Sequence, residues 1–345
     1  MDSIYKIAAE PQLLKEELEI RFPDRRFFLL TDRKVARHCL PLIKPYLPSG
    51  TTIFQIPDGE QHKNLATCET VWEFLLKHKA DRESVLLILG GGVVSDLGAF
   101  CASVYKRGID FVLIPTTLLA MVDASIGGKT AVDFQSGKNL IGTFKIPRLI
   151  WTFPDFLKTL PQIGFLSGFA EVIKHTLISD AVGWNQIRKG DPELMDWLSL
   201  LEASQKIKQA IVDQDPFETG IRQKLNAGHT VGHAIESLFL SRGKSIPHGY
   251  AVAAGLIMES YLSFIEGLMD AGELGQVEEF LFATYGGAKL SPDDCLPLWN
   301  WMLQDKKNKK GTVRMALIGP LGSCRDGQPI SKKKWERAFS YYLGI

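Results

Sequence analysis

The chain has 345 residues, which is enough for two domains with separate hydrophobic cores. With 45% hydrophobic and 23% charged residues, its composition is that of an ordered globular protein and excludes a disordered chain. The formal net charge of +1 excludes an overall electrostatic attraction to nucleic acid or membranes, so any anion binding needs local clusters of lysine and arginine.

The cysteines and the N-terminus indicate the compartment. The five cysteines are scattered and form no CxxC pair, which favours reduced thiols in a cytosolic protein. Residues 1–20 include acidic side chains and lack the continuous apolar core of a signal peptide. No stretch approaches the roughly 20 apolar residues that span a bilayer. We therefore expect a cytoplasmic protein.

Strand-like and helix-like patterns alternate over about the first 150 residues. Residues 26–31 and 52–56 are expected to form strands, and residues 68–78 have helical spacing. Residues 84–89 are a continuous apolar run, typical of a buried parallel strand, and residues 111–115 form a further expected strand. This order predicts an open parallel sheet covered by helices.

A glycine-rich turn, Gly90-Gly91-Gly92, ends the apolar run at residues 84–89 and leads into a helical pattern of small side chains. Glycine lets a backbone approach a pyrophosphate, and a helix N-terminus offers free N–H groups. The turn therefore predicts a nucleotide-phosphate site, where Asp96 caps the helix or accepts from a cofactor hydroxyl. The spacing is not GxGxxG, so a tight turn without a ligand is the alternative. Residues 58–63 are open to two interpretations, ribose contacts or a surface turn.

After about residue 152 amphipathic helical patterns dominate, and we expect helices at 169–178, 198–212, 230–240 and 251–266. Residues 313–318 have the pattern of one short late strand. The sequence thus predicts an α/β domain over residues 1–152 and an α-helical domain over residues 153–345.

Three separate segments of the C-terminal half carry the residues of a divalent-metal site, and they contain four of the seven histidines. They supply Glu171, His229 with His233, and His248. Carboxylate and imidazole groups are good ligands for Zn²⁺ or a similar ion. His229 and His233 are four residues apart on one helix face, which suits either two ligands or one ligand beside a proton-handling group. Each histidine alone is equally typical of an ordinary core or surface position.

Several lysine and arginine residues lie in or near motif-like segments, and a dense group of them would hold a phosphate and a carboxylate. Lys129 follows Gly127-Gly128, and Lys138 follows Gly137, so glycine brings the backbone close at both places. Solvated surface charge is the alternative. The candidates are Lys129, Lys138, Lys174, Lys208 and Arg222.

With these residues in view, the chain resembles the 3-dehydroquinate synthases, which are sugar phosphate cyclases. The similarity runs from Asp32 to about residue 322. Its most specific stretch is residues 115–130, and several further motifs follow in the same order. They are residues 137–139, 167–175 and 225–233.

The resemblance implies an N-terminal Rossmann-like NAD-binding domain and a C-terminal helical domain that binds metal and substrate. It implies Glu171, His229 and His248 as ligands of Zn²⁺ or Co²⁺. It implies proton handling by His233 with help from Lys174, and catalytic contributions from Lys129, Arg222 and Asn226.

The remaining implied contacts belong to NAD and to the substrate. For NAD they are Asp32, Glu60, Lys63, Gly91, Gly92, Val93, Asp96, Thr116, Thr117, Lys129, Lys138 and Thr159. For the substrate they are Asp123, Lys129, Lys138, Asn139, Lys174, Lys208, Arg222, Asn226, His233 and one of Lys306 and Lys307. Arg107 resembles an arginine that reaches a phosphate across a homodimer interface.

The implied reaction converts 3-deoxy-D-arabino-heptulosonate 7-phosphate to 3-dehydroquinate and phosphate, a carbon–oxygen lyase step of the shikimate pathway to chorismate and aromatic amino acids. It proceeds by transient NAD-dependent oxidation, phosphate elimination, reduction and aldol closure. The alternatives are a metal- and NAD-dependent polyol or alcohol dehydrogenase, another cyclase such as 2-deoxy-scyllo-inosose synthase, and an inactive scaffold. The phosphate-binding candidates argue against the dehydrogenase.

Two positions depart from the family pattern. Tyr250 stands where the family usually has glutamate, directly after the His-Gly pair, so the support of the His248 ring is expected to differ while the ligand itself is kept. Ser95 replaces a frequent glycine in the nucleotide turn, and little effect is expected unless that backbone needs a positive φ.

Overall fold

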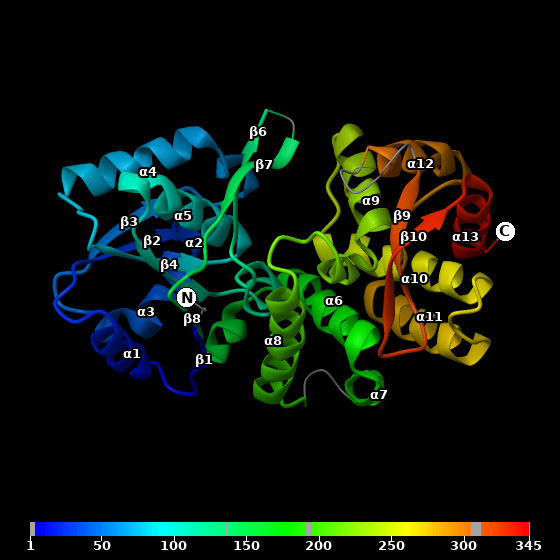
Figure 1. Ribbon diagram of the computed structural model, residues 1–345, viewed down its shortest axis with the longest axis horizontal. Helices are drawn as coiled ribbons and strands as arrows, with labels where there is room; N and C mark the ends of the chain where they lie inside the picture. Colours follow the sequence, from blue (N-terminus) through cyan, green and yellow to red (C-terminus); the bar gives the residue numbers. More distant parts are fainter. Residues whose placement is uncertain (1–3, 136, 191–194, 305–311, 345) are drawn as a thin grey trace. The chain divides into compact units, whose positions relative to one another are not determined.

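The computed structural model describes residues 4–135, 137–190, 195–304 and 312–344 (Figure 1). The chain divides into two compact units. The first comprises residues 1–165 and 197–205, and the second comprises residues 166–196 and 206–345. Among the described residues, no helix combines the length and the apolar character that crossing a bilayer requires.

The first unit is built on a six-stranded parallel sheet in the order β1-β8-β5-β4-β2-β3. The predicted strands appear as β2 (Phe27–Asp32), β3 (Thr52–Ile56), β4 (Val85–Gly90) and β5 (Asp110–Pro115). The edge strand β1 (Ile4–Ile7) and β8 (Leu149–Thr152) have four residues each, which is too short for a periodic signal in the sequence. The predicted parallel α/β fold is confirmed.

Helices cover both faces of this sheet. Figure 1 shows α4 (Leu65–Lys77) and α5 (Gly92–Val104) on one side, and α1 (Leu13–Arg21) and α3 (Leu40–Ile43) on the other. This follows from right-handed crossovers. The connections through α1 and α3 run toward the β3 edge of the sheet, and those through α4 and α5 run away from it, so the two pairs of helices lie on opposite faces. The short α2 (Arg33–His38) begins directly after β2. The core is formed by the apolar faces of α4, α5 and the central strands.

An antiparallel pair, β6 (Lys129–Phe134) and β7 (Gly137–Phe144), stands apart from the main sheet. A π-helical segment (Ala120–Ala124) precedes it, and a 3-10 segment (Pro154–Thr159) follows β8. The pair carries the predicted ligand-binding residues Lys129, Lys138 and Asn139. Asn139 has a φ of 54°, in the left-handed region where asparagine is better tolerated than most residues, and its N–H donates to Asp133 at 2.7 Å.

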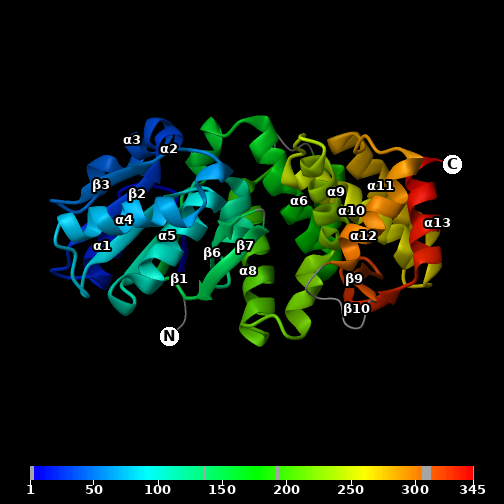
Figure 2. The ribbon, with the colours of Figure 1, turned by 90° about the horizontal axis from the view of Figure 1, so that it is seen from above.

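The second unit is mainly helical. Its helices are α6 (Gln162–Ser179), which begins in the first unit, α7 (Ala181–Lys189), α9 (His229–Ser241), α10 (His248–Ile265), α11 (Ala271–Tyr285), α12 (Cys295–Leu303) and α13 (Lys332–Leu343). The long α8 (Trp197–Gln214) also belongs to both units. Helix α10 is buried along almost its whole length and packs against α9, α11 and α13. In Figures 1 and 2 α9, α10 and α11 run side by side.

One two-stranded antiparallel sheet adds to the helices of this unit. The expected late strand appears as β9 (Val313–Ile318) and pairs with β10 (Cys324–Ile330). The sequence of β10 contains Gly327 and Pro329, both poor strand formers, and its register shifts between Arg325 and Gln328. The partner strand β9, which packs on α10, therefore decides the conformation of β10.

Candidate metal centre and nucleotide turn

Three helices of the second unit bring one carboxylate and two imidazoles together. Glu171 lies in α6 and is fully buried, while His229 and His248 are the first residues of α9 and α10. Glu171 Oε1 is 3.3 Å from His229 Nε2 and 3.3 Å from His248 Nε2. The three donor atoms all lie within 4.8 Å of one another, so they are close enough to share a single ion.

Glycine residues let these three helices approach backbone to backbone. A Cβ atom on Gly255 of α10 would lie 2.0 Å from the carbonyl oxygen of Gly228, which precedes α9. A Cβ atom on Gly249 would lie 2.5 Å from Ser167 Cα of α6. Since larger residues would push the helices apart at both places, these glycines set the separation of the three donor groups.

Both candidate ligand histidines are oriented through their second ring nitrogen. His229 Nδ1 lies 3.0 Å from the carbonyl oxygen of Ala227, which only accepts, so an Nδ1–H donates there and Nε2 remains on the Glu171 side as the candidate metal-binding atom. His248 Nδ1 lies 3.4 Å from Glu236 Oε1 of α9. A histidine held by a carboxylate or carbonyl in this way is the usual arrangement of a metal ligand.

Glu236 therefore supports His248 from a neighbouring helix, although sequence reasoning missed it. A signal was present, because Glu236 lies seven residues after His229 and three after His233, on the same helix face. Tyr250 stands where the family usually has glutamate. Its ring packs edge-on against that of Tyr285, with ring centroids 5.3 Å apart.

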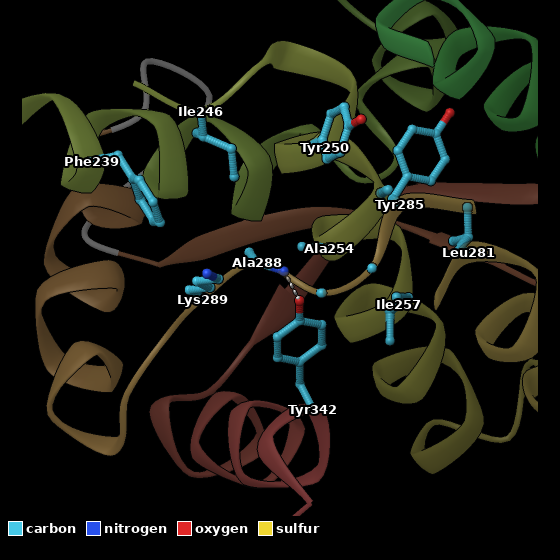
Figure 3. A pocket seen from close by; sticks show the side chains of 13 residues that line it. Phe239, Ile246, Tyr250, Ala254, Ile257, Leu281, Tyr285, Ala288, Lys289 and Tyr342 are labelled. Atoms are coloured by element: carbon cyan, nitrogen blue, oxygen red, sulfur yellow. Dashed lines mark hydrogen bonds between the residues drawn. The ribbon is translucent and has the colours of Figure 1, made fainter. Parts of the chain in front are cut away.

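Figure 3 shows Tyr250 and Tyr285 side by side at a pocket of about 170 Å³ between α10 and the C-terminal end of α11. The Tyr285 hydroxyl donates to the carbonyl oxygen of Leu166 at 2.9 Å, and the Tyr342 hydroxyl accepts from the N–H of Ala288 at 2.7 Å. The aromatic pair therefore links α10 and α11 to the first turns of α6, by packing and a hydrogen bond rather than by charge. The second departure, Ser95, lies in the first turn of α5 with a helical backbone, so no glycine is needed there.

Burial and charge act against each other at the three donor groups. Burial alone would raise the pKa of Glu171, but the Lys174 ammonium and the imidazoles hold that pKa well below its usual range. Burial lowers the pKa of His229 and outweighs the attraction of Glu171. Burial also lowers the pKa of His248, but the nearby carboxylates of Glu171 and Glu236 outweigh this effect and raise that pKa to about 10. The carboxylate is thus ionised and ready to bind a cation.

Two other predicted catalytic residues of this unit, His233 and Lys174, lie beside the donor groups. The His233 ring centroid is 5.3 Å from that of His229 and 6.3 Å from that of His248. Lys174 forms a buried ion pair with Glu171. Lys208 and Arg222 are also almost completely buried, which is unusual for cations and marks them as more than surface charge.

A loop organised by Asp215 carries Arg222 and Asn226, and sequence reasoning did not single it out. The Asp215 carboxylate accepts from the backbone N–H groups of Thr219 at 3.0 Å, Gly220 at 2.7 Å and Arg222 at 3.1 Å. Arg222 Nη1 donates to the carbonyl oxygen of Pro216 at 2.6 Å. Asn226 Nδ2 donates to Glu218 Oε1 at 3.0 Å. The loop therefore fixes both predicted substrate residues.

The predicted nucleotide residues gather at the carboxyl end of the parallel sheet in the first unit. Asp32 ends β2, the glycine turn follows β4, and Thr116 and Thr117 follow β5. A Cβ atom on Gly91 would lie 2.9 Å from Thr117 Cγ2, so this turn stays open only without a side chain. The carboxyl edge of an open parallel sheet is where dinucleotides bind.

Lys63 connects this turn to the antiparallel pair. Its side chain is buried, and its Nζ lies 2.6 Å from Asp96 Oδ2 and 2.5 Å from Asn139 Oδ1. Lys63 and Asp96, which are expected to bind NAD, are thereby held next to Asn139, which is expected to bind substrate. Of the other predicted residues of the first unit, Val93 lies in α5 directly after Gly92. The rest lie in short 3-10 or π-helical segments: Glu60, Arg107, Asp123 and Thr159. Lys306 and Lys307 lie outside the described residues.

Comparison with known proteins gives the same assignment. The family of 3-dehydroquinate synthase N-terminal domains matches residues 53–167, and that of the C-terminal domains matches residues 168–308. The 3-dehydroquinate synthase of Parabacteroides distasonis is 36% identical over 337 residues, covering 95% of both chains. That of Campylobacter concisus is 38% identical over 306 residues, covering 88% of both.

Solved structures share the fold at lower identity. The 2-epi-5-epi-valiolone synthase of Streptomyces hygroscopicus, solved with NAD⁺ and Zn²⁺, superposes with a TM-score of 0.86 at 24% identity, covering 100% of this chain and 98% of that one. A 2-deoxy-scyllo-inosose synthase, solved with carbaglucose-6-phosphate, NAD⁺ and Co²⁺, gives 0.82 at 22% identity, covering 98% and 96%. A glycerol dehydrogenase of Schizosaccharomyces pombe superposes with a lower TM-score of 0.67 at 14% identity, covering 99% of this chain and 89% of that one. On the family matches and the curated relatives, the chain belongs to the 3-dehydroquinate synthase family.

Proposed function

We propose that this protein is a 3-dehydroquinate synthase that converts 3-deoxy-D-arabino-heptulosonate 7-phosphate to 3-dehydroquinate and phosphate. The observation that carries the proposal is the convergence of Glu171, His229 and His248 within 4.8 Å in a chain of this family. The relatives that share at least a third of its residues over most of its length bear this name.

The three donors fit a catalytic Zn²⁺ or Co²⁺. Two imidazoles and one carboxylate leave a coordination position for substrate, as catalytic zinc sites do. The second nitrogen of each ring already has its acceptor, in Ala227 and in Glu236. The nearby Lys174 ammonium compensates the Glu171 charge in the metal-free protein, a charge that a bound metal ion would also compensate.

The glycine turn fits the pyrophosphate of NAD. Gly91 directly precedes α5, whose first N–H groups have no acceptor within the helix. Asp32 and Asp96 lie at the same edge of the sheet, where a carboxylate can accept from a ribose hydroxyl. We assign NAD binding to residues 1–152, and metal and substrate binding mainly to residues 153–345.

NAD and a metal ion, when bound, would supply a reversible oxidation of one substrate hydroxyl and its activation toward deprotonation. This chain's residues arrange that chemistry. His233 takes the proton of the hydroxyl that is oxidised and returns it later, and Lys174 stabilises the charge that develops there. In the second unit, Lys208, Arg222 and Asn226 hold the anionic groups of the substrate. In the first unit, Asp123, Lys129, Lys138 and Asn139 contact it. Holding a flexible intermediate in one conformation supplies much of the remaining rate enhancement.

We further propose a cytoplasmic homodimer in which Arg107 reaches a phosphate bound to the partner subunit. Arg107 is exposed and has a φ of 69°, a strained conformation that suits a side chain held for a binding role.

The test is incubation of the purified protein with the heptulosonate phosphate, NAD⁺ and Zn²⁺, following inorganic phosphate and the absorbance of NADH. A synthase releases stoichiometric phosphate while NADH stays at catalytic levels. A polyol dehydrogenase would accumulate NADH and release no phosphate. A cyclase of another specificity would release phosphate from a different sugar phosphate only. An inactive scaffold would do neither.

A further inference from the structure

A buried carboxylate in α10 lies against the beginning of α9. Glu259 follows His248 by about three helical turns and is fully buried. Its Oε2 accepts from the N–H of Gly228 at 2.6 Å, and its Oε1 accepts from the N–H of Val231 at 3.4 Å. These two N–H groups flank His229, the candidate metal ligand that begins α9.

Helix α9 cannot cap itself at this end. Helices usually begin with a side chain that accepts from the free N–H groups of the first turn. Here the preceding residue is Gly228, with a φ of 76° and no side chain. A Cβ atom there would lie 2.6 Å from Leu256 Cγ and 2.9 Å from the Val252 carbonyl oxygen of α10. The close packing of α9 against α10 therefore excludes a capping side chain at residue 228. The capping carboxylate comes from Glu259 of α10.

A carboxylate suits this position for two reasons. Each of its oxygens accepts one N–H group, and its negative charge is stabilised by the partial positive charge of the helix N-terminus. The two capped N–H groups and the candidate ligand His229 belong to the same short segment. Ala227, whose carbonyl oxygen fixes the His229 ring, directly precedes Gly228, so displacement of Gly228 also displaces the acceptor of His229 Nδ1.

We propose that Glu259 is a positioning residue for His229: by capping α9 across the helix pair, it fixes the backbone that orients this imidazole toward Glu171. The inference rests on the metal centre of the proposed function. Glu259 does not touch the ion. It acts through Gly228, Ala227 and His229.

The test uses the full-length Glu259→Gln protein. The amide keeps one acceptor oxygen and places an NH₂ group against a backbone N–H, so one of the two hydrogen bonds is lost. We expect Zn²⁺ affinity to fall by about 10- to 100-fold in folded protein, as for other outer partners of metal ligands. Affinity is measured by competition with a chromophoric chelator. In the metal-free protein, ¹⁵N spectra of labelled imidazoles are expected to show the His229 ring changing from one tautomer to a mixture.

Ser260→Ala is the matched control. Ser260 is the next residue of α10, is equally buried, and its hydroxyl lacks a hydrogen-bond partner within the described residues. Its removal leaves the cap intact, so Zn²⁺ affinity and the His229 tautomer are expected to stay as in the unmodified protein. Glu259→Asp is the second variant if Glu259→Gln does not fold. The aspartate side chain is one methylene group shorter, so its carboxylate lies farther from both N–H groups. We expect Zn²⁺ affinity to fall several-fold.

A folded Glu259→Gln or Glu259→Asp protein with unchanged affinity and an unchanged His229 tautomer would overturn the inference. Failure of the proposed metal centre gives a different result. In that case the unmodified protein and His229→Ala would bind Zn²⁺ equally, whatever residue 259 is.

Discussion

At the scale of single residues, the candidate centre depends on three donor groups that come from three separate helices. His229 is almost buried, and its Nε2 faces Glu171 Oε1 at 3.3 Å. His233 lies one turn further along α9 and does not belong to the group of donor atoms within 4.8 Å, as far as the described residues show. It is therefore suited to proton handling rather than to substitution for a lost ligand.

We predict that His229→Ala abolishes turnover and weakens Zn²⁺ binding by at least about 100-fold, while the fold is kept. The imidazole is a donor at the end of a helix, so its loss removes little packing. Phosphate release, chelator competition and far-UV circular dichroism measure the three effects. Full turnover by a folded His229→Ala protein would contradict the assignment.

The buried Lys174–Glu171 pair leads to a second prediction. Removing one member of a buried ion pair leaves an uncompensated charge and costs about 3–5 kcal/mol. Lys174→Met is therefore expected to destabilise the metal-free protein by up to about 3–5 kcal/mol, since Glu171 is completely buried and, within the described residues, keeps only the His248 imidazolium beside it. Zn²⁺ is expected to restore part of the loss, because it provides the missing positive charge. Urea unfolding with and without Zn²⁺ measures both, and equal destabilisation in the two conditions would argue against metal binding at Glu171.

At the scale of elements, helix spacing decides where the donors meet. A Cβ atom on Gly255 would lie 2.0 Å from the Gly228 carbonyl oxygen. Gly255→Ala must therefore separate α9 from α10, and we expect destabilisation of about 1–3 kcal/mol together with weaker Zn²⁺ binding. Gly275→Ala is the matched control, because Gly275 lies in α11 with open space around its Cβ position. This control is expected to leave Zn²⁺ affinity unchanged and to stabilise the protein slightly, as measured by thermal unfolding.

The loop held by Asp215 makes a prediction about pH. Hydrogen bonds from the N–H groups of Thr219, Gly220 and Arg222 lower the pKa of Asp215 from 3.8. Because the folded-state pKa is the lower one, the carboxylate stabilises the fold above pH 3.8 and loses this effect as pH falls through the folded-state value. Asp215→Asn is therefore expected to unfold at lower urea concentration than the unmodified protein at about pH 5–8. The difference closes at more acidic pH. A difference that persists there would mean that the carboxylate charge is not its cause.

At the scale of the whole molecule, the proposed chemistry is divided between two compact units. One carries the nucleotide turn and the antiparallel pair, and the other carries the metal donors and the buried cations. Each unit alone explains only part of the reaction.

Lys138 on β7 tests the contribution of the first unit to substrate binding. Lys138→Ala is expected to raise KM and lower kcat together, because the substrate phosphate is held in both the ground and the transition state. Lys15→Ala removes an equal charge from the exposed face of α1 and is expected to leave both constants unchanged. Unchanged kinetics for Lys138→Ala would remove this lysine from the site.

The sequence by itself determined the parallel α/β unit, the helices α4, α5, α6, α8, α9 and α10, and the family. Continuous apolar runs such as residues 84–89 specify a buried strand, and helical periodicity specifies α9 and α10, because both signals are local. It also supplied the candidate donor residues, since long motifs in a fixed order name a family without any knowledge of distances.

Only the tertiary structure decided how those residues are held. Glu236 behind His248, Glu259 on the first turn of α9 and the contact of Gly255 with Gly228 each join positions from separate elements. The same is true of β10, a poor strand by its own residues. Local periodicity reports which face of an element is buried, whereas the partner of a buried polar group depends on which elements pack together, and that is settled only when the chain has folded.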